Sequence, residues 1–305
     1  MLLPVPFPST SVEMILQKTL INICGSERSG STMLDLIIGN DPKAFSCGEI
    51  YALYRPWRTH HFQPTCGCGE ECEFLREFKS IREGQFHNQL FEKFGYLWVV
   101  DSSKDLSWVI DNQKWVIQNQ GRVLNLLIWK KPATFSISFL KRGKDLNHWR
   151  PIFIDYYKKF LETKLPFVSV CYDDFVNNPQ KHLMFICDLL GMDNFDRKMN
   201  FWEKKHHHLF GSGGTGKQVL EGSSEIFRRV EYPAQFEKDI KLIEDTLDND
   251  VEITAIINKL KQREISIINT SNNAFNYNNF GQKPLWYYKQ KIVLKLKRYF
   301  PESYR

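Results

Sequence analysis

The sequence predicts an α/β protein of three layers, in which a central, mostly parallel sheet is covered by helices on both faces. Two observations support this fold class. Short runs that are apolar at every position alternate with longer amphipathic stretches, and such runs are typical of parallel strands buried on both faces. In addition, the first run leads through a glycine-rich turn into a helical pattern, which is the strand, loop and helix order of phosphate-binding folds.

Four apolar runs are predicted to be strands, and polar residues follow each of them. The runs are Thr19–Cys24, 96–100, 123–129 and 167–171. Because the carboxyl ends of parallel strands meet at one edge of a sheet, where ligands of such folds bind, the four polar segments are expected to border one crevice. Helices are expected at 31–39, 75–94, 106–118, 151–163 and 182–190.

A single domain over residues 1–265 is predicted, followed by a C-terminal segment of different composition. Residues 266–305 are rich in Asn at first and then alternate basic with apolar residues, so an irregular linker and a basic amphipathic helix are expected there. The helix is expected to pack on the domain with its basic side in solvent. The alternative is that it binds a membrane or a protein partner.

The composition fits a globular protein with an anionic ligand. Of 305 residues, 42% are hydrophobic and 25% are charged, which leaves enough apolar material for a core. The net charge of +6 suits a negatively charged ligand, but the basic residues form no concentrated stripe, so no nucleic-acid partner is expected. Without a secretory signal or a run of about 20 apolar residues, the protein is expected in the cytoplasm, with no transmembrane segment. The oligomeric state is left open.

The glycine-rich turn at 25–32 has the spacing of a nucleotide phosphate loop but lacks its lysine. Its sequence is GSERSGST, and Ser31 stands where the lysine of G-x-x-x-x-G-K-[ST] would be. That lysine neutralises the phosphates of ATP, so its absence argues against ATP chemistry. The N–H groups at the helix start, with Arg28 and the hydroxyls of Ser29 and Thr32, still suit an oxyanion such as a phosphosulfate. The fold is therefore predicted to be P-loop-like, and the alternative is a tight turn that binds no ligand.

With these motifs the chain resembles the sulfotransferase family over most of residues 19–215. The family's loop for the 5′-phosphosulfate reads like GSxRSGST. A second family signature grips the 3′-phosphate with a basic residue at a strand end and a Ser eight positions later, which here are Lys130 and Ser138. The family more often has Arg-Asp-Pro at this strand end, so the Lys130-Lys131-Pro132 sequence keeps the charge but loses the bidentate geometry of arginine.

The resemblance implies that the protein binds 3′-phosphoadenosine 5′-phosphosulfate (PAPS) and needs no metal ion. The segment 206–217 resembles a degraded form of the family's HxxxGNPxR loop, which covers the nucleotide and would bring Lys217 near a phosphate. The expected PAPS-binding residues are Ser26, Arg28, Ser29, Gly30, Ser31, Thr32, Lys130, Ser138 and Lys217.

The resemblance also implies catalytic roles for Glu49, Lys104 and Arg28. Glu49 is similar in position to the glutamate that acts as general base in tyrosylprotein sulfotransferases, and Lys104 to the lysine that these enzymes direct at the sulfonate. A carboxylate could accept the proton of the attacking hydroxyl, while Arg28 and Lys104 would stabilise charge on the leaving oxygen. His60 and His61 are the alternative base, because the cytosolic branch of the family uses histidine.

The predicted function is therefore transfer of a sulfonate group from PAPS to a hydroxyl or amine of a small-molecule or carbohydrate acceptor. Two alternatives remain: a kinase-like P-loop phosphotransferase, which Ser31 disfavours, and a non-catalytic nucleotide-binding relative, which the intact catalytic residues disfavour. The acceptor is expected beneath segments 51–95 and 143–160, whose aromatic residues could equally belong to the core. They are Tyr51, Tyr54, Trp57, Phe62, Trp149, Phe153, Tyr156 and Tyr157.

Three cysteines lie close together in the sequence, at Cys66, Cys68 and Cys72. Three interpretations are open: a zinc site with His60 or His61 as the fourth ligand, a disulfide or redox-labile pair, and plain structural thiols. The three adjacent histidines at 206–208 are expected to bind no metal, because neighbouring side chains diverge and rarely share one ion. No metal ligand is therefore assigned from the sequence.

Overall fold

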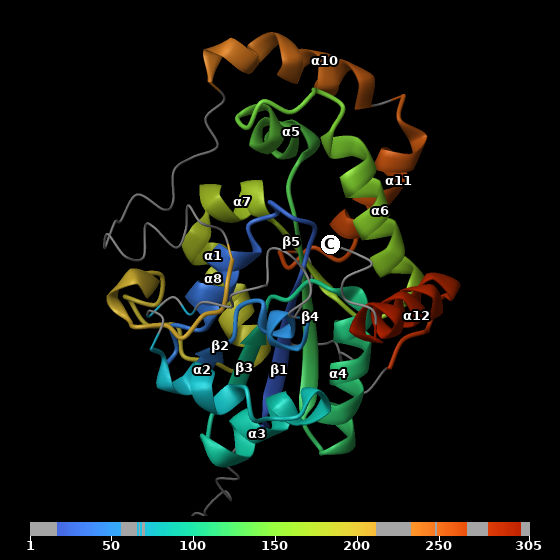
Figure 1. Cartoon of the computed structure of the whole chain (residues 1–305). Helices are drawn as coiled ribbons and strands as arrows, with labels where there is room; N and C mark the ends of the chain where they lie inside the picture. Colours follow the sequence, from blue (N-terminus) through green and yellow to red (C-terminus); the bar gives the residue numbers. More distant parts are fainter. Residues whose placement is uncertain are drawn as a thin grey trace, which may run out of the picture.

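Five parallel strands form the centre of the protein (Figure 1). The computed structural model describes residues 17–55, 66, 68, 71–211, 233–247, 249–266 and 280–299. The strands lie in the order β2-β3-β1-β4-β5, and every pairing between neighbours is parallel. The α/β fold class predicted from the sequence is thus confirmed, with a wholly parallel sheet in the described residues. The strands are β1 Thr19–Cys24, β2 Ala44–Ser46, β3 Trp98–Asp101, β4 Arg122–Trp129 and β5 Val168–Cys171.

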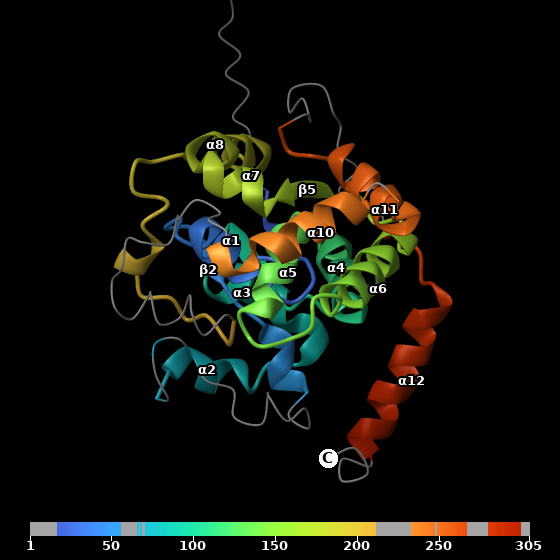
Figure 2. The same ribbon diagram turned by 90° about the horizontal axis from the view of Figure 1, so that it is seen from above.

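Both faces of the sheet are covered by helices (Figure 2). Alternate side chains of a strand point to opposite faces, so Ile21 and Ile23 of β1 pack in one cluster while Leu20 and Cys24 pack in others. This two-sided burial explains why the strands are apolar throughout. One face is covered by α1 Ser31–Ile38, α7 Tyr172–Asn177 and α8 Pro179–Leu190, and the other by α3 Phe86–Lys93, α4 Leu106–Gln118 and α6 Trp149–Glu162.

The helix predicted over 75–94 is two helices, so this prediction was wrong. The chain forms α2 Glu73–Phe78, then a short 3₁₀ turn at Glu83–Gln85, then α3. At the turn, Gly84 lies against the indole of Trp115, and a Cβ at this position would be 2.8 Å from Nε1. The approach of the chain to α4 therefore interrupts the helix, which the amphipathic pattern alone does not reveal.

Three further helices pack near the carboxyl edge and side of the sheet (Figure 1). Above the sheet, α5 Pro132–Leu140 packs against α10 Glu237–Leu247 and the buried side chains of Ala133, Ile137 and Ile240 join them. Alongside α6 lies α11 Val251–Lys261, after an N-cap at Asp250, whose side chain accepts from the N–H of Ile253. Among the described residues, no helix combines the length and apolar character needed to span a bilayer.

The C-terminal helix α12 Leu285–Tyr299 contacts α4. The hydroxyl of Tyr287 donates to Asp111 at 2.6 Å, Lys291 pairs with the same carboxylate at 2.8 Å, and Gln290 donates to Asp105 at 2.9 Å. Tyr287 is buried, whereas several of the other apolar side chains of α12 are exposed. The helix is therefore held to the domain at its first turns, by these polar contacts and by the packing of Trp286 and Tyr287 against the core.

Candidate functional site

The glycine-rich loop between β1 and α1 forms an N-terminal helix end suited to an anion. Gly30 caps α1 in a left-handed conformation with φ of 100°, and no acidic residue lies in the first turn of the helix. A side chain at position 30 would overlap the ring of Tyr172, so glycine is required for the close packing of the loop against α7. The N–H groups at a helix start and the helix dipole together favour negative charge at this point.

Two polar atoms of the loop are buried without a hydrogen bond to the described residues. They are Nε of Arg28 and Oγ of Ser29. Buried polar groups in folded proteins almost always have partners, so these two atoms are candidates for contact with a bound anion. Burial lowers the pKa of Arg28, and the neighbouring charge of Arg142 lowers it further. An anion bound here would accept hydrogen bonds from the unpaired atoms and would stabilise the positive charge of Arg28.

Glu49, Lys104 and Ser31, all predicted from the sequence, meet at the carboxyl edge of the sheet. Nζ of Lys104 forms a close ion pair with Glu49 and lies 3.4 Å from Oγ of Ser31. The Glu49 and Lys104 side chains are 17% and 19% exposed, so the pair is accessible to a substrate but shielded from bulk water. A carboxylate, an ammonium group and the first residue of the loop helix thus face one another.

Glu49 is held in place by a backbone pairing with a distant segment. Its N–H donates to the carbonyl of Leu209 at 2.7 Å, and the N–H of Leu209 donates to the carbonyl of Cys47 at 3.2 Å. Leu209 also pairs with Gly48 in a parallel bridge. The chain near residue 209 therefore fixes the backbone on both sides of Gly48, and with it the direction of the Glu49 side chain.

Arg28 and Lys104 both have positive φ values, of 67° and 63°. Side chains with a Cβ rarely adopt this left-handed conformation, because the Cβ approaches the following carbonyl oxygen. Non-glycine residues in such conformations cluster at functional sites. The fold therefore holds the two cations in positions that local backbone preference does not favour.

A cavity of about 610 Å³ opens beside the ion pair. This volume lies in the range of small-molecule sites. Of the aromatic residues expected around the acceptor, Tyr51 lines the cavity, whereas Trp149 and Phe153 belong to the buried core. The lining residues are Glu27, Glu49, Tyr51, Ser103, Lys104, Asp105, Phe210 and Gly211.

Tyr156 and Tyr157 connect the loops of the site rather than lining the cavity. The hydroxyl of Tyr156 accepts from the N–H of Gly25 at 3.0 Å and donates to the carbonyl of Lys104 at 2.9 Å. The hydroxyl of Tyr157 donates to the carbonyl of Ile128 at 2.8 Å and accepts from Ser26 at 3.4 Å. These roles join residues far apart in the chain, so no sequence signal could have assigned them.

Asp101 fixes the loop that carries Lys104. It is buried, and it accepts hydrogen bonds from His87 at 2.8 Å, from the indole of Trp108 at 2.7 Å and from the N–H of Ser103 at 2.8 Å. Burial would raise the pKa of Asp101, but the hydrogen bond and charge of His87, with the other donors, lower it below its usual value. The carboxylate is therefore ionised and fully used in holding the loop.

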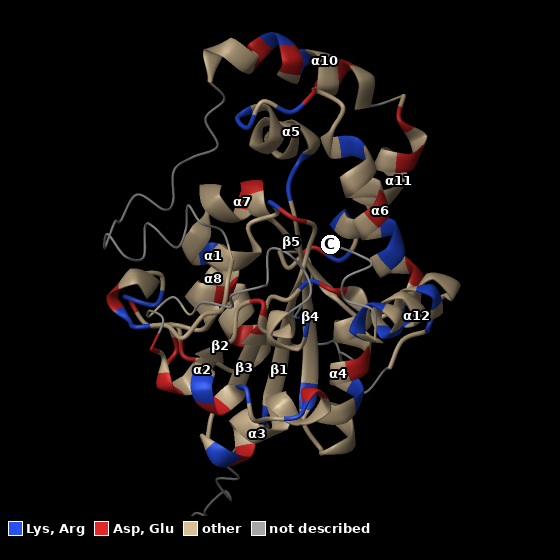
Figure 3. Cartoon of the chain, in the orientation of Figure 1, with Lys and Arg blue, Asp and Glu red and all other residues tan. Residues whose placement is uncertain are grey.

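Lys130 provides a second cationic position, at the end of β4. Its Nζ lies 4.2 Å from the centroid of the Tyr172 ring, the same ring that packs on Gly30. Burial lowers the pKa of Lys130 to about 8, partly offset by Asp173, and Arg28 and other nearby cations lower it further. Figure 3 shows basic residues along the segment that joins β4 to α5. The side chains of Lys130 and Arg28 therefore belong to one region of excess positive charge.

The remaining predicted residues differ in how far the structure describes them. Ser138 lies on α5, where its hydroxyl donates to the carbonyl of Thr134 at 3.1 Å. Lys131, next to Lys130, pairs with Asp174 at 2.7 Å in an exposed position, so it is not directed at the site. Lys217, His60 and His61 lie outside the described residues. Thr32 borders Gly211, a residue of the cavity wall.

Comparisons with known proteins give remote structural similarity only. No protein-family model and no curated protein matches the sequence. The sulfotransferase domain of the Synechococcus PCC 7002 olefin synthase is 18% identical over 77% of this chain and 96% of its own, with a TM-score of 0.43.

Two further solved structures show similar values. The sulfotransferase domain from the curacin biosynthetic pathway is 17% identical over 75% of this chain and 96% of its own, with a TM-score of 0.46. A sulfotransferase from Alicyclobacillus acidocaldarius is 14% identical over 78% of this chain and 98% of its own, with a TM-score of 0.34. At these identities, the function of the site has to be argued from its own residues.

Proposed function

We propose that the protein is a sulfotransferase that moves a sulfonate group from PAPS to a hydroxyl or amine of a small-molecule or carbohydrate acceptor. One observation carries this proposal: the Glu49–Lys104 ion pair contacts Ser31 of a phosphate loop that lacks lysine, beside a cavity of about 610 Å³. A base, a cation and an anion-binding helix end are the groups that such a transfer requires.

The two cationic positions suit a donor with two separate anionic groups. The loop from Ser26 to Thr32, with the unpaired Nε of Arg28, would hold the 5′-phosphosulfate. Lys130 would hold the 3′-phosphate together with Ser138, which lies on the following helix, α5. Lys217 is proposed as an additional contact to the nucleotide. PAPS supplies an activated sulfonate group whose leaving group is a phosphate oxygen.

The roles of the chain's own residues follow from their positions. The Glu49 carboxylate can accept the proton of an acceptor hydroxyl in the cavity, because it lines that cavity and is only partly exposed. The Lys104 ammonium lies between Glu49 and Ser31, so it can stabilise negative charge that develops next to the phosphate loop. Arg28 adds a second positive charge at the same loop.

The kinase-like alternative is further disfavoured by Asp101. P-loop enzymes that use ATP hold Mg²⁺ with the loop hydroxyl and an acidic residue at a strand end. Asp101 ends β3, the strand next to β1, but it is 2% exposed and its oxygens accept from three protein donors. It is therefore committed to the protein structure rather than free to bind Mg²⁺.

Nucleotide-dependent stabilisation tests the proposal. 3′-Phosphoadenosine 5′-phosphate, which carries both anionic groups, is expected to raise the melting temperature without added magnesium, because a ligand that binds only the folded state stabilises it. At 100 times its Kd the stabilisation would be about 2.7 kcal/mol. ATP is expected to give a much smaller shift under the same conditions. Equal stabilisation by Mg-ATP would instead favour the phosphotransferase.

Substitution of Lys130 tests the 3′-phosphate position. Lys130→Ala is expected to weaken binding of 3′-phosphoadenosine 5′-phosphate by about 1.5–3 kcal/mol, the range for a hydrogen bond to a charged group. Because the pKa of Lys130 is lowered to about 8, its charge is present below that pH and lost above it. Wild-type affinity, measured by calorimetry, should therefore fall as the pH rises above about 8, where the phosphate charge is already constant.

The neighbouring lysine provides a matched control. Lys131→Ala removes an equal charge one residue away, but this lysine is exposed and paired with Asp174, so affinity should change little. The Lys130→Ala variant should also lose the fall in affinity above pH 8. Unchanged affinity in Lys130→Ala would place the 3′-phosphate elsewhere.

A further inference from the structure

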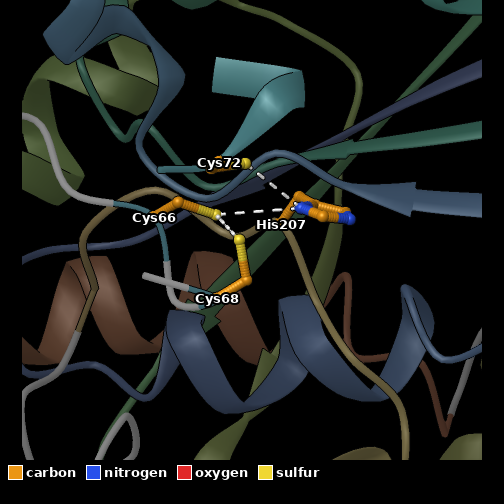
Figure 4. Close-up of side chains that lie close together, drawn as sticks. All are labelled: Cys66, Cys68, Cys72 and His207. Carbon is orange, nitrogen blue, oxygen red and sulfur yellow. Dashed lines mark hydrogen bonds between the residues drawn. The ribbon is translucent and has the colours of Figure 1, made fainter. Parts of the chain in front are cut away.

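Three cysteines and one histidine converge at one point outside the proposed active site (Figure 4). The ligand atoms of Cys66, Cys68, Cys72 and His207 all lie within 4.8 Å of one another. The sulfur atoms of Cys66 and Cys68 are 3.2 Å apart, and Nδ1 of His207 lies 3.3 Å from the sulfur of Cys72 and 4.0 Å from that of Cys66. Four soft or borderline ligand groups thus point at a common centre.

We propose that these four residues bind one zinc ion in a structural site. Zinc in such sites is tetrahedral and takes four Cys or His ligands, with Zn–S distances of about 2.3 Å and Zn–N distances of about 2.0–2.1 Å. Ligand atoms around such an ion lie roughly 3.5–3.8 Å apart. Three of the separations, at 3.2, 3.3 and 4.0 Å, lie close to this value, and all of them are within 4.8 Å, so small side-chain movements complete the tetrahedron.

The ligands are held in place by their surroundings, as zinc ligands require. Cys72 caps α2, and its sulfur accepts from the N–H of Leu75 at 3.4 Å, which fixes the position of the sulfur atom. The ring of His207 packs against Phe74 with centroids 4.2 Å apart. Each contact fixes a ligand atom in the direction of the common centre.

A disulfide explains the cluster less well. The described cysteines are all free thiols, and Cys66 and Cys68 are separated by a single residue. Any one disulfide among the three would leave a third thiol and the histidine without a role. Four ligands with three sulfurs and one nitrogen in tetrahedral array are typical of zinc, whereas oxygen-rich sites suit magnesium or calcium.

The fourth ligand in the described structure is a histidine that the sequence did not single out for this role. Among the described residues the cluster is completed by His207, whereas His60 and His61, the histidines nearest to the cysteines in the sequence, lie outside the described residues. The adjacent histidines diverge, as expected: His206 contacts the carbonyl of Phe201 at 2.9 Å, and Nδ1 of His208 lies 2.7 Å from the hydroxyl of Ser46. Only one of the three therefore turns toward the cysteines, and the proposal replaces the expectation that no metal is bound.

The ion would join two distant segments that build the wall of the active-site cavity. Leu209 pairs with Cys66 on one side and with Gly48 on the other, and its carbonyl accepts from the N–H of Glu49. Phe210 and Gly211, which follow directly, line the cavity. Zinc bound at His207 would therefore anchor the segment that positions the Glu49 backbone. The metal proposal itself stands on the four ligands and does not rest on the sulfotransferase assignment.

Elemental analysis of the full-length protein tests the proposal. The protein purified without chelator should contain about one zinc per chain, and exchange with cobalt should give the visible bands of a tetrahedral ion and a thiolate charge-transfer band. Cys68→Ser and His207→Phe should each lose the metal. The Phe substitution keeps an aromatic ring against Phe74, so the protein should remain folded.

Two matched variants separate metal binding from packing. His207→Cys should retain zinc, because four thiolates also form a tetrahedral site. Cys187→Ala, which removes a buried thiol far from the cluster, should retain it as well. Wild-type protein without zinc, wild-type protein with iron in its place, or full zinc content in His207→Phe would each overturn the proposal. None of these measurements depends on the acceptor or on turnover.

Discussion

Glu49→Gln is expected to lower kcat by about 10²–10⁴-fold, the usual contribution of a general base. The amide keeps the shape of the side chain and its place in the cavity wall, but it cannot accept the proton of an attacking hydroxyl. Lys104 retains its contact with Ser31 at 3.4 Å, so the phosphate loop should be unaffected. Turnover at saturating donor and acceptor should therefore fall while the Kd of 3′-phosphoadenosine 5′-phosphate stays close to the wild-type value.

Glu27 is the matched control for this substitution. It lines the same cavity but is exposed and forms no ion pair with Lys104 in the described structure. Glu27→Gln should therefore lower turnover far less than Glu49→Gln does, and any effect should arise through the charge of the neighbouring Arg28. If Glu49→Gln is fully active while a change at His60 or His61 abolishes activity, the base is a histidine and the assignment of Glu49 is wrong.

Lys104→Met is expected to lower kcat by about 10²–10³-fold, the loss typical when one donor to a developing negative charge is removed. Methionine has a similar length and the same Cβ, so the left-handed backbone conformation at this position is equally strained in both proteins. Since the charge on the leaving oxygen develops as the sulfonate departs, binding of the intact donor should weaken much less than turnover falls.

Steady-state kinetics together with donor binding measurements separate the two effects. Lys104→Arg, which keeps a positive charge on a longer side chain, should recover part of the activity lost in Lys104→Met. A Lys104→Met enzyme with normal kcat and a raised donor KM would contradict the prediction, because it would show that Lys104 serves binding alone.

The strands and helices with strong local signals could be predicted from the sequence. The bounds of β1 and α4 match the predictions, because a run of buried residues and a long amphipathic pattern mark them without reference to the rest of the chain. By contrast, β2 has only three residues, Ala44–Ser46, and gave no recognisable pattern. The break between α2 and α3 depends on packing against Trp115, which is distant in the sequence.

The same distinction between local sequence patterns and contacts with distant residues applies to the candidate site. The convergence of Ser31 and Lys104 could be predicted, because each follows a predicted strand whose end lies at the carboxyl edge of the sheet. Glu49 follows β2, which the sequence did not reveal, so its place beside Lys104 was expected from the family resemblance alone. The contacts of Tyr156 with Gly25 and Lys104 span 131 and 52 positions, and His207 reaches the cysteines across more than 130 positions. Side-chain partners at such separations are set by the folded packing and leave no local pattern.

The left-handed backbone conformations of Arg28 and Lys104 lower the folding stability, whereas their side chains are proposed to serve catalysis. Glycine would relieve roughly 1–2 kcal/mol of backbone strain at each position, partly offset by about 0.5–1 kcal/mol from its greater freedom in the unfolded chain. Loss of Arg28 would also remove its repulsion with Arg142. A directed-evolution experiment that rewards heat resistance alone would therefore tend to discard the two cations proposed to act in catalysis, so variants of this protein need to be selected for turnover at the same time.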